Sequence, residues 1–434
     1  MNTIYQKRRE QLLQNMQSNS IAIIPSADLI YRNGDSSYHF RQDSDFYYMT
    51  GFNEPESVAV LVKEAQSVKY ILFVRPKDAQ SELWDGKRAG LDGAKTVFGA
   101  NESYDIADLN NKMPELIGSA KQIYCHLGKN KSFDEGLDKW LNQVRKKVRA
   151  GVNSPSAFIA LEKIIHEMRL IKSADEIAIM RKANEISKAA HLRAMQICKP
   201  GMMEYEIEAE LSYVFQKNGA RHAAYTSIVG GGENACVLHY IDNNQTLKNG
   251  DLILIDAGCE YENYSSDITR TFPVNGKFSA EQKALYQIVL DAQLAALDLA
   301  KPGTVWTQLQ DAIIRTITQG LVSLGILNGK VDELIAQKAF LPFYMHNSGH
   351  WLGLDTHDAG NYKLENQWRT LQPGMVITVE PGIYVGKNPN VDKKWHDIGI
   401  RIEDDIVITQ DGHENLTQGL PKTIADLEKM IGTV

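Results

Sequence analysis

The sequence is poor in cysteine and lacks long apolar runs. Its four cysteines, Cys125, Cys198, Cys236 and Cys259, are scattered over 434 residues and form no CxxC pair. We therefore expect reduced core cysteines, because a disulfide framework or a cysteine zinc site needs more closely spaced cysteines. No run approaches the ~18 apolar residues of a membrane-spanning helix, and residues 1–16 have no apolar core of the kind that marks a secretory signal. These absences predict a cytoplasmic protein.

A surplus of basic residues is also absent, since the formal net charge is −7. Binding to nucleic-acid phosphates or to an anionic membrane surface depends on a basic surface, so neither partner is expected. The apolar content of 43% and the charged content of 23% are typical of an ordinary globular protein. The length allows two or three domains.

Two regions of different character follow one another along the chain. Residues 1–172 are predicted to form an α/β domain, with strands at residues 20–25, 57–62 and 70–74. Residues 32–56 are rich in both aromatic and polar side chains, which indicates a surface loop or a loop that reaches a ligand site. Ser173 and Glu176 form the S-x-x-E pattern of a capping box and predict the start of a long helix. A second domain is therefore expected over residues 173–434.

Two carboxylates of the second domain stand beside apolar, strand-like runs. Asp256 ends the run that begins at Leu252, and Asp267 comes directly before the run of residues 268–272. Buried strands normally avoid ionised groups, so these charges need compensation. Hard divalent cations bind carboxylate oxygens, and a metal ion is therefore the expected partner.

The same pattern occurs a second time. Residues 371–384 (LQPGMVITVEPGIY) match residues 247–260 (LKNGDLILIDAGCE) in the order of leucine, glycine, strand-like run, acid and second glycine. The match aligns Asp256 with Glu380. Such a repeat indicates a duplicated unit, in which two facing halves each bring an acid-tipped strand to a shared centre.

A second acid follows in each half, because Glu403 comes after Glu380 as Asp267 comes after Asp256. Four carboxylates at one centre would repel one another, and two divalent ions about 3.5 Å apart are the usual compensation. A water held between two cations is activated for attack on a carbonyl. The pattern therefore predicts a dimetal hydrolase acting on a peptide or another amide.

Histidines near these acids could complete the ligand set and would favour Mn, Fe, Co or Zn over Mg or Ca. Three of the eleven histidines, His346, His350 and His357, fall within twelve positions. His239 is a separate candidate, either for a structural hydrogen bond or for donation to a developing oxyanion. Arg401 could orient a carboxylate.

Two further acids, Asp404 and Asp405, directly follow Glu403. We expect them to be solvated or paired with other residues and not to bind metal.

The order Asp256, Asp267, His350, Glu380, Glu403 resembles the five-ligand pattern of the pita-bread metallopeptidases. The motifs GENACVLHY, SDITRTFPVNGKF, HWLGLDTHD, VEPGIY and GIRIEDDI are most similar to the aminopeptidase P group of that family, as is RQDSDFYYMTGFNEPE near the N-terminus. The resemblance covers nearly the whole chain. It implies an α/β (α+β) protein, with a creatinase-like N-terminal domain before a pita-bread catalytic domain of internal pseudo-two-fold symmetry.

The resemblance also implies a role for each residue of the centre. Asp256 would bind one ion, Asp267 and Glu403 would bridge both ions, and His350 and Glu380 would bind the other. The remaining implied site residues are His239 at the scissile carbonyl or its oxyanion, His357 and His346 along the substrate pocket, and Tyr384, Arg401 and Asp35 in a hydrogen-bonded group beside the metals. Trp84 and Arg149 are further candidates for a substrate pocket, in this or a neighbouring subunit.

The implied activity is the release of the N-terminal residue from peptides with proline in the second position, by attack of a metal-bridging hydroxide. The family implies two divalent ions per subunit, of which Mn²⁺ is the usual metal, and a homotetramer. Prolidase shares the fold and the ligands but cuts only Xaa-Pro dipeptides, and it is the first alternative. A non-catalytic pita-bread binding module is the second, which the complete ligand set disfavours.

Overall fold

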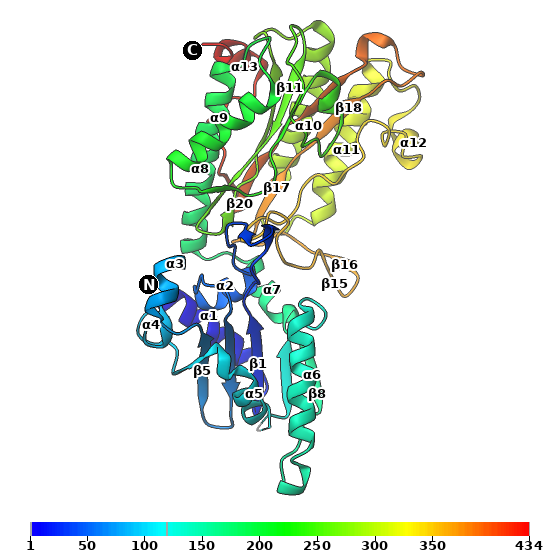
Figure 1. Ribbon diagram of the computed structural model, residues 1–434. Helices are drawn as coiled ribbons and strands as arrows, with labels where there is room; N and C mark the ends of the chain where they lie inside the picture. Colours follow the sequence, from blue (N-terminus) through cyan, green and yellow to red (C-terminus); the bar gives the residue numbers. More distant parts are fainter. Residues whose placement is uncertain (1, 119, 434) are drawn as a thin grey trace. The chain divides into compact units, whose positions relative to one another are not determined.

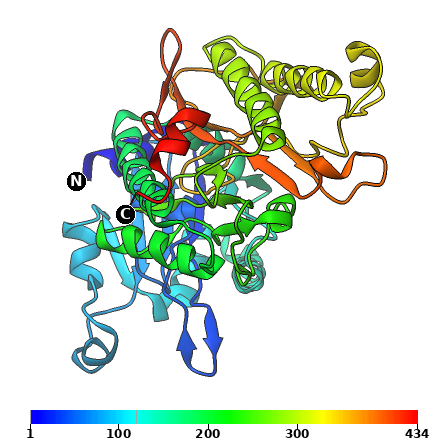
Figure 2. The ribbon, with the colours of Figure 1, turned by 90° about the horizontal axis from the view of Figure 1, so that it is seen from above.

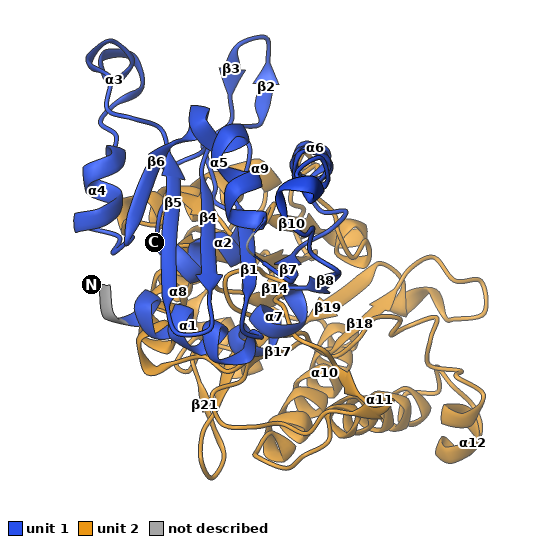
Figure 3. Ribbon diagram, turned by 90° about the horizontal axis from the view of Figure 1, so that it is seen from below, with its two compact units in different colours: residues 1–169 blue, residues 170–434 orange. Residues whose placement is uncertain are grey.

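The structure is a computed structural model that describes residues 2–118 and 120–433. Contacts between residues divide the chain into unit 1 (Met1–Arg169) and unit 2 (Leu170–Val434), which are coloured separately in Figure 3. The boundary predicted after residue 172 falls close to this division, and as a domain boundary it stays a prediction.

Unit 1 is built on one mixed sheet of six strands in the order β6-β5-β4-β1-β7-β8. The strands are β1 (Ser20–Pro25), β4 (Val58–Lys63), β5 (Val68–Val74), β6 (Glu102–Asp105), β7 (Gln122–Cys125) and β8 (Ala157–Ala160). Strands β1, β4 and β5 confirm the three strands predicted from the sequence. A separate hairpin of β2 (Tyr31–Asn33) and β3 (Ser36–Ser37) projects from this sheet (Figure 3).

Helices flank the sheet of unit 1. They are α1 (Asn2–Asn15), α2 (Ser44–Thr50), α3 (Ala79–Asp85), α4 (Gly90–Thr96), α5 (Leu109–Ile117), α6 (Lys131–Arg145) and α7 (Glu162–Leu170), with short 3-10 helices η1 (Ile106–Asp108) and η2 (Val148–Ala150). Helix α6 is amphipathic, because Phe133, Leu137, Trp140 and Val144 recur at helical spacing and are all buried. These side chains share a core with Ile23 of β1.

Helix α2 corrects the prediction that residues 32–56 form a loop throughout. The Asp43 side chain accepts hydrogen bonds from the backbone N–H groups of Asp45 and Phe46, and this cap starts the helix. Gly51 ends it with a left-handed φ of 65°, which glycine adopts without steric cost. The segment therefore carries a short helix that is largely buried and not a surface loop alone.

Unit 2 combines long helices with several small antiparallel sheets. The helices are α8 (Ala174–Ile197), α9 (Glu204–Lys217), α10 (Ala280–Leu299), α11 (Trp306–Ser323), α12 (Val331–Ala336) and α13 (Ile424–Met430). The predicted capping box starts α8, because Ser173 and Glu176 exchange side-chain to backbone hydrogen bonds. Helix α8 packs against α9, and α10 packs against α11. The latter pair lies side by side as yellow-green helices in Figures 1 and 2.

The principal sheets of unit 2 have the strand orders β10-β11-β14 and β17-β20-β21, and β18 pairs with β19. The strands are β9 (His222–Ala223), β10 (Ile228–Gly231), β11 (Leu252–Asp256), β12 (Cys259–Tyr261), β13 (Tyr264–Ser265), β14 (Thr269–Pro273), β15 (Lys363–Leu364), β16 (Gln367–Trp368), β17 (Val376–Val379), β18 (Gly382–Val385), β19 (Ile398–Arg401), β20 (Asp404–Ile408) and β21 (His413–Asn415), with 3-10 helices η3 (Gly232–Cys236) and η4 (Lys393–Trp395). Each half thus contains a helix pair and a corresponding strand pair, β11/β14 or β17/β20. This correspondence agrees with the predicted duplication.

The β-prone run of residues 400–408 does not form one continuous strand. Strand β19 ends at Arg401 and pairs with β18, whereas β20 begins at Asp404 and pairs with β17. Glu403 lies in the break between the two strands, where the backbone changes partner. Glu403 therefore belongs to neither strand ladder, and its side chain is oriented by hydrogen bonds such as that from the Thr269 hydroxyl.

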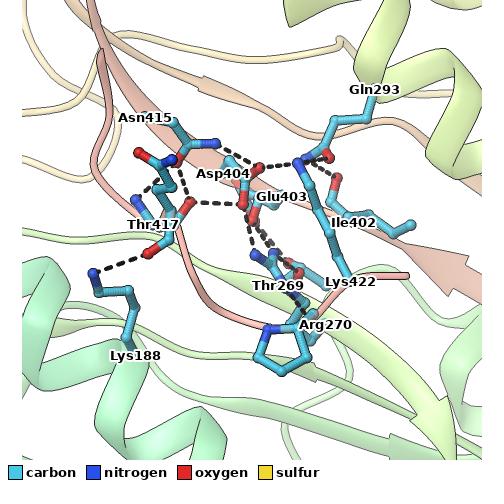
Figure 4. A network of polar contacts seen from close by, with 12 residues as sticks. Lys188, Thr269, Arg270, Gln293, Ile402, Glu403, Asp404, Asn415, Thr417 and Lys422 are labelled. Carbon is cyan, nitrogen blue, oxygen red and sulfur yellow. Dashed lines mark hydrogen bonds and ion pairs between the residues drawn. The ribbon is translucent and has the colours of Figure 1, made fainter. Parts of the chain in front are cut away.

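A buried ion pair joins the two halves behind Glu403 (Figure 4). Arg270 of β14 donates from Nη2 to Asp404 Oδ1 at 2.7 Å and from Nη1 to the Glu403 carbonyl oxygen at 2.6 Å. Lys422 Nζ donates to Asp404 Oδ2 at 2.6 Å, and the Thr417 hydroxyl donates to Oδ1. These cations hold the pKa of Asp404 well below its ordinary range although burial opposes this. Asp404 is thus a pairing residue, while its alternative prediction as a solvated residue is wrong.

None of the helices in the described part of the chain combines the length and apolar composition that a bilayer crossing requires. The four cysteines carry free thiols, and Cys125, Cys198 and Cys259 are buried. These three are core residues, as predicted, whereas Cys236 is partly exposed.

Replacement of Asp404 should destabilise unit 2 strongly. Asp404→Ala leaves Arg270 and Lys422 as buried cations without their carboxylate, and such a loss typically costs about 3–5 kcal/mol of unfolding free energy. Urea unfolding followed by circular dichroism measures the change. Asp411→Ala is the matched control, because Asp411 is exposed and surface substitutions usually change stability by less than about 0.5 kcal/mol. Equal stability of the two variants would contradict the structural role of the ion pair.

Candidate metal centre

Strand ends of both halves bring the predicted ligands together. Asp256 is the last residue of β11, and its partner in the ladder is Thr269 of β14. Asp267 lies just before β14, Glu380 just after β17 and Glu403 just before β20. At these positions the regular ladder stops, so polar side chains can converge without displacing apolar core residues.

His350 comes from a segment that lies against β17. Its backbone N–H donates to Thr378 Oγ1 at 3.1 Å, and the Thr378 N–H donates to the His350 carbonyl oxygen. A Cβ atom on the preceding Gly349 would lie 2.1 Å from the Thr378 carbonyl oxygen. Only glycine therefore allows the backbone to approach β17 closely enough to direct His350 toward the carboxylates.

The donor atoms of the centre are spaced like metal ligands. His350 Nε2 is 3.3 Å from Asp267 Oδ2 and 3.8 Å from Glu380 Oε1. One donor atom each from Asp267, His350 and Glu403 lie within 4.8 Å of one another. Tetrahedral ligands at about 2.0–2.1 Å from a metal ion are about 3.3 Å apart. The donor set therefore has the separation that a small divalent ion requires.

The His350 ring is oriented by its second nitrogen. Nδ1 lies 2.9 Å from the Trp351 carbonyl oxygen, which can only accept a hydrogen bond, so Nδ1 carries the proton. Nε2 is then the atom that faces Asp267 and Glu380. This arrangement is typical of metal-binding histidines, in which the remote N–H is held by a carbonyl or a carboxylate.

Arg401 connects the first half of the centre with the second. It donates from Nη2 to Asp256 Oδ2 at 2.6 Å, from Nη1 to the Tyr384 hydroxyl at 2.8 Å and from Nε to Thr269 Oγ1 at 3.2 Å. The Tyr384 hydroxyl is also 2.9 Å from His346 Nε2. A polar chain thus runs from Asp256 to His346, and the Thr269 hydroxyl extends it to Glu403 Oε2 at 2.7 Å.

Tyr225 is a residue of the centre that the sequence did not reveal. Its hydroxyl lies 2.6 Å from Asp256 Oδ1 and 2.5 Å from Asp267 Oδ1, so its single proton can serve either acid. Burial, followed by the nearby carboxylates, raises its pKa well above the ordinary value and keeps the phenol protonated. The sequence carries only a weak signal for this role. Tyr225 lies shortly before β10, and the pairing of Ile228 of β10 with Asp256 of β11 brings Tyr225 close to the acids.

Asp405 is a second residue whose role the sequence did not reveal. It is fully buried, and its Oδ2 accepts a hydrogen bond from the Asp267 backbone N–H at 2.9 Å. Asp405 therefore pairs with the main chain that carries a predicted ligand, and it is not solvated.

The carboxylates of the centre lie in surroundings that oppose their ionisation. Burial raises the pKa of Glu380 to about 7 and that of Glu403 well above its ordinary range, and the neighbouring acids add to both effects. Burial also raises the pKa of Asp256. Burial acts in the same direction on Asp267, but His350, Tyr225 and Arg401 together outweigh it and lower the pKa. The protein groups alone therefore under-compensate the negative charge, which is the condition expected of a site for divalent cations.

Two of the other predicted histidines, His346 and His357, lie beside this centre. The His357 ring lies 4.4 Å from the His350 ring, and His346 Nδ1 is 3.8 Å from Glu380 Oε2. Burial lowers the pKa of His346 to about 4, with further contributions from Arg401 and His239. His239 and His357 are exposed, whereas His346 is half-buried. A neutral His346 next to Tyr384 is a hydrogen-bonding group and not a charged one.

Three predicted residues belong to unit 1 and lie outside the described geometry of the centre. Asp35 is exposed in the turn between β2 and β3, Trp84 is 81% exposed in α3, and Arg149 is exposed in η2. Their contact with the centre or with a substrate stays a prediction.

Comparisons with known proteins agree along the whole chain. Residues 5–124 match the aminopeptidase P N-terminal domain, and residues 178–410 match metallopeptidase family M24. The Xaa-Pro aminopeptidase of Escherichia coli is 45% identical over 98% of this chain and 97% of its own length. That of Haemophilus influenzae is 44% identical over 98% and 96%.

Solved structures give the same result. The aminopeptidase PepP of Pseudomonas aeruginosa matches with a TM-score of 0.98 and 52% identity, over 99% of this chain and 98% of that chain. A zinc-substituted aminopeptidase P of Escherichia coli in complex with product matches with a TM-score of 0.97 and 45% identity, over 99% and 98%. The predicted resemblance and fold class are confirmed. The chain therefore belongs to metallopeptidase family M24, in its aminopeptidase P group, and has an N-terminal α/β domain followed by a pita-bread domain.

Proposed function

We propose that the chain is a metal-dependent aminopeptidase that releases the N-terminal residue from peptides with proline in the second position. The observation behind this function is the meeting of four acids at the strand ends of both halves, namely Asp256, Asp267, Glu380 and Glu403, with His350 beside them. Relatives that match over nearly their whole length are named Xaa-Pro aminopeptidase, and this supports the activity over that of a prolidase or a binding module.

Two divalent ions fit the charge of the donor set. Four ionised carboxylates and the Arg401 guanidinium leave three negative charges, more than one divalent ion neutralises. We assign Asp256 to one ion, His350 and Glu380 to the other, and Asp267 and Glu403 to both. When bound, such ions supply an activated water and polarise the scissile carbonyl. The mixed oxygen and histidine set suits Mn²⁺, the metal we propose for this centre.

The residues around the ligands fix where the donor atoms point. Arg401 and Tyr225 each bind one oxygen of Asp256, so the carboxylate plane has little freedom to rotate. The Thr269 hydroxyl does the same for Glu403 Oε2, and the Thr378 hydroxyl approaches Glu380 Oε1 at 3.4 Å. Such contacts preorganise the ligands, because they reduce the rearrangement needed when ions and substrate bind.

The two exposed histidines, His239 and His357, and the half-buried His346 are suited to contact with substrate. We propose that His239 donates a hydrogen bond to the scissile carbonyl oxygen, where negative charge develops during attack. His357 and His346 would position the peptide beside the ligands. The roles of Asp35, Trp84 and Arg149, the homotetramer and the cytoplasmic location remain predictions from the family resemblance and from the sequence.

A peptide panel with Mn²⁺ tests the proposed specificity. We expect cleavage of Xaa-Pro-Yaa tripeptides after the first residue, much slower turnover of Xaa-Pro dipeptides, and no cleavage of Xaa-Ala-Yaa controls. Chromatography of the products and initial rates provide the measurement. A preference for dipeptides would identify a prolidase instead, and no cleavage by a metal-loaded chain would favour a binding module.

Removal of a bridging ligand should abolish turnover and metal retention together. Glu403→Ala is expected to lower kcat by roughly 10³-fold or more, because a metal ion supplies several kcal/mol of transition-state stabilisation. The metal content should fall by at least one ion per chain in elemental analysis. Glu333→Ala, in an exposed part of α12, is the control and should change neither quantity. A variant that keeps its activity and both ions would exclude the bridging role.

Replacement of His239 separates a role in the transition state from a role in binding. If His239 donates to the developing oxyanion, His239→Ala should lower kcat by about 10²-fold or more with little change in KM. His239→Gln, which retains a donor, should recover part of the rate. An unchanged kcat with a raised KM would instead make His239 a substrate-binding residue.

A further inference from the structure

Unit 1 contains a cluster of one aspartate and two histidines that the M24 centre does not involve. Asp45 lies in α2, His126 directly after β7 and His166 in α7, and both helices are labelled in Figure 1. The side chains of Asp45, His126 and His166 are 1%, 10% and 35% exposed, respectively. Three segments that are far apart in the sequence therefore bring metal-binding residue types to one place.

The donor atoms of this cluster are spaced like those of the M24 centre. Asp45 Oδ2 is 3.3 Å from His166 Nε2 and 3.4 Å from His126 Nε2. The three donor atoms all lie within 4.8 Å of one another. Tetrahedral ligands at about 2.0–2.1 Å from an ion are about 3.3 Å apart. The separation between His350 Nε2 and Asp267 Oδ2 is also 3.3 Å.

His126 points an unsatisfied nitrogen into the cluster. Its Nε2 is buried and has no hydrogen-bond partner, although it lies 3.4 Å from Asp45 Oδ2. Its Nδ1 faces Glu162 Oε2 at 3.6 Å, and this carboxylate favours the ring proton on Nδ1. A nitrogen lone pair directed at a carboxylate is repulsive unless a cation lies between them.

The surrounding charges leave one oxygen of Asp45 for such a cation. Arg169 Nη1 binds Asp45 Oδ1 at 2.7 Å, whereas Oδ2 faces the two histidines and is hydrogen-bonded to His166 Nε2 at 3.3 Å, a contact that a bound ion would replace. Lys129 Nζ is 3.6 Å from Oδ2 but 2.6 Å from Asp43 Oδ2, and its side chain is 51% exposed. Lys129 can therefore remain paired with Asp43 while an ion occupies the space between Asp45 and the histidines.

We propose that Asp45, His126 and His166 bind a divalent ion of the zinc class in unit 1. Two histidines and one carboxylate leave a fourth position for water, and the partial exposure of His166 provides access from solvent. Glu162 acts as the outer carboxylate that orients His126. The ion would join α2, the end of β7 and α7, and its binding energy would add to the stability of unit 1.

Metal analysis of the full-length chain tests this site independently of the M24 centre. The chain is stripped with a chelator, dialysed against Zn²⁺ and analysed for metal per chain. His166→Ala and His126→Gln should each hold one ion fewer than the wild type, whatever number the M24 centre holds. His39→Ala, at an exposed histidine of unit 1 outside the cluster, should lose none. Equal metal content in the wild type and both cluster variants would overturn the proposal.

Lys129→Met provides a second test that does not depend on removing a ligand. Loss of a nearby positive charge should tighten Zn²⁺ binding by roughly tenfold or more. Because the Lys129 side chain is half-exposed, we expect the variant to fold normally. Competition with a chromogenic chelator measures the Zn²⁺ affinity. The same measurement on the wild type and on Lys129→Met, each also carrying His166→Ala, shows which bound ion belongs to the cluster. A cluster that is only an ion-pair network would show the same Zn²⁺ affinity with and without Lys129, and this result would overturn the proposal.

Discussion

The excess of buried negative charge at the centre of unit 2 is the constraint on which the surrounding structure depends. Asp267 and Glu403 are nearly inaccessible to water, and burial raises the pKa of Glu380 to about 7. A fold can carry such a group only if hydrogen bonds and cations face it from several sides. Arg401, Tyr225 and the hydroxyls beside the acids meet this need in part, and the remaining charge defines a site for metal ions.

Much of this centre could be predicted from the sequence because its signals are local. An acid at the end of an apolar run is visible without a structure, and the repeated pattern around Asp256 and Glu380 indicates that two such runs meet. Tyr225 could not be predicted in this way, since its contact with Asp267 depends on the pairing of β10 with β11. A strand register is a tertiary property that a single sequence specifies only weakly.

The errors in the sequence predictions have the same origin. Asp404 and Asp405 follow a predicted ligand in an otherwise polar stretch, which made a solvated position plausible. Their strand, β20, lies between β17 and β21, and both acids are fully buried there. The sequence predicts a loop over residues 32–56 because α2 is only seven residues long, too short for apolar residues to repeat at helical spacing. The Asp43 cap and Gly51 set its limits instead.

The break between β19 and β20 has a consequence for how the protein is made. The proposed ligands Asp256 and Asp267 are synthesised well before Glu403. The buried ion pair of Arg270 with Asp404 also includes Lys422, which is synthesised later still. A nascent chain therefore cannot assemble a complete centre until its C-terminal half has emerged and packed. A chain that ends before residue 403 would therefore lack part of the proposed ligand set.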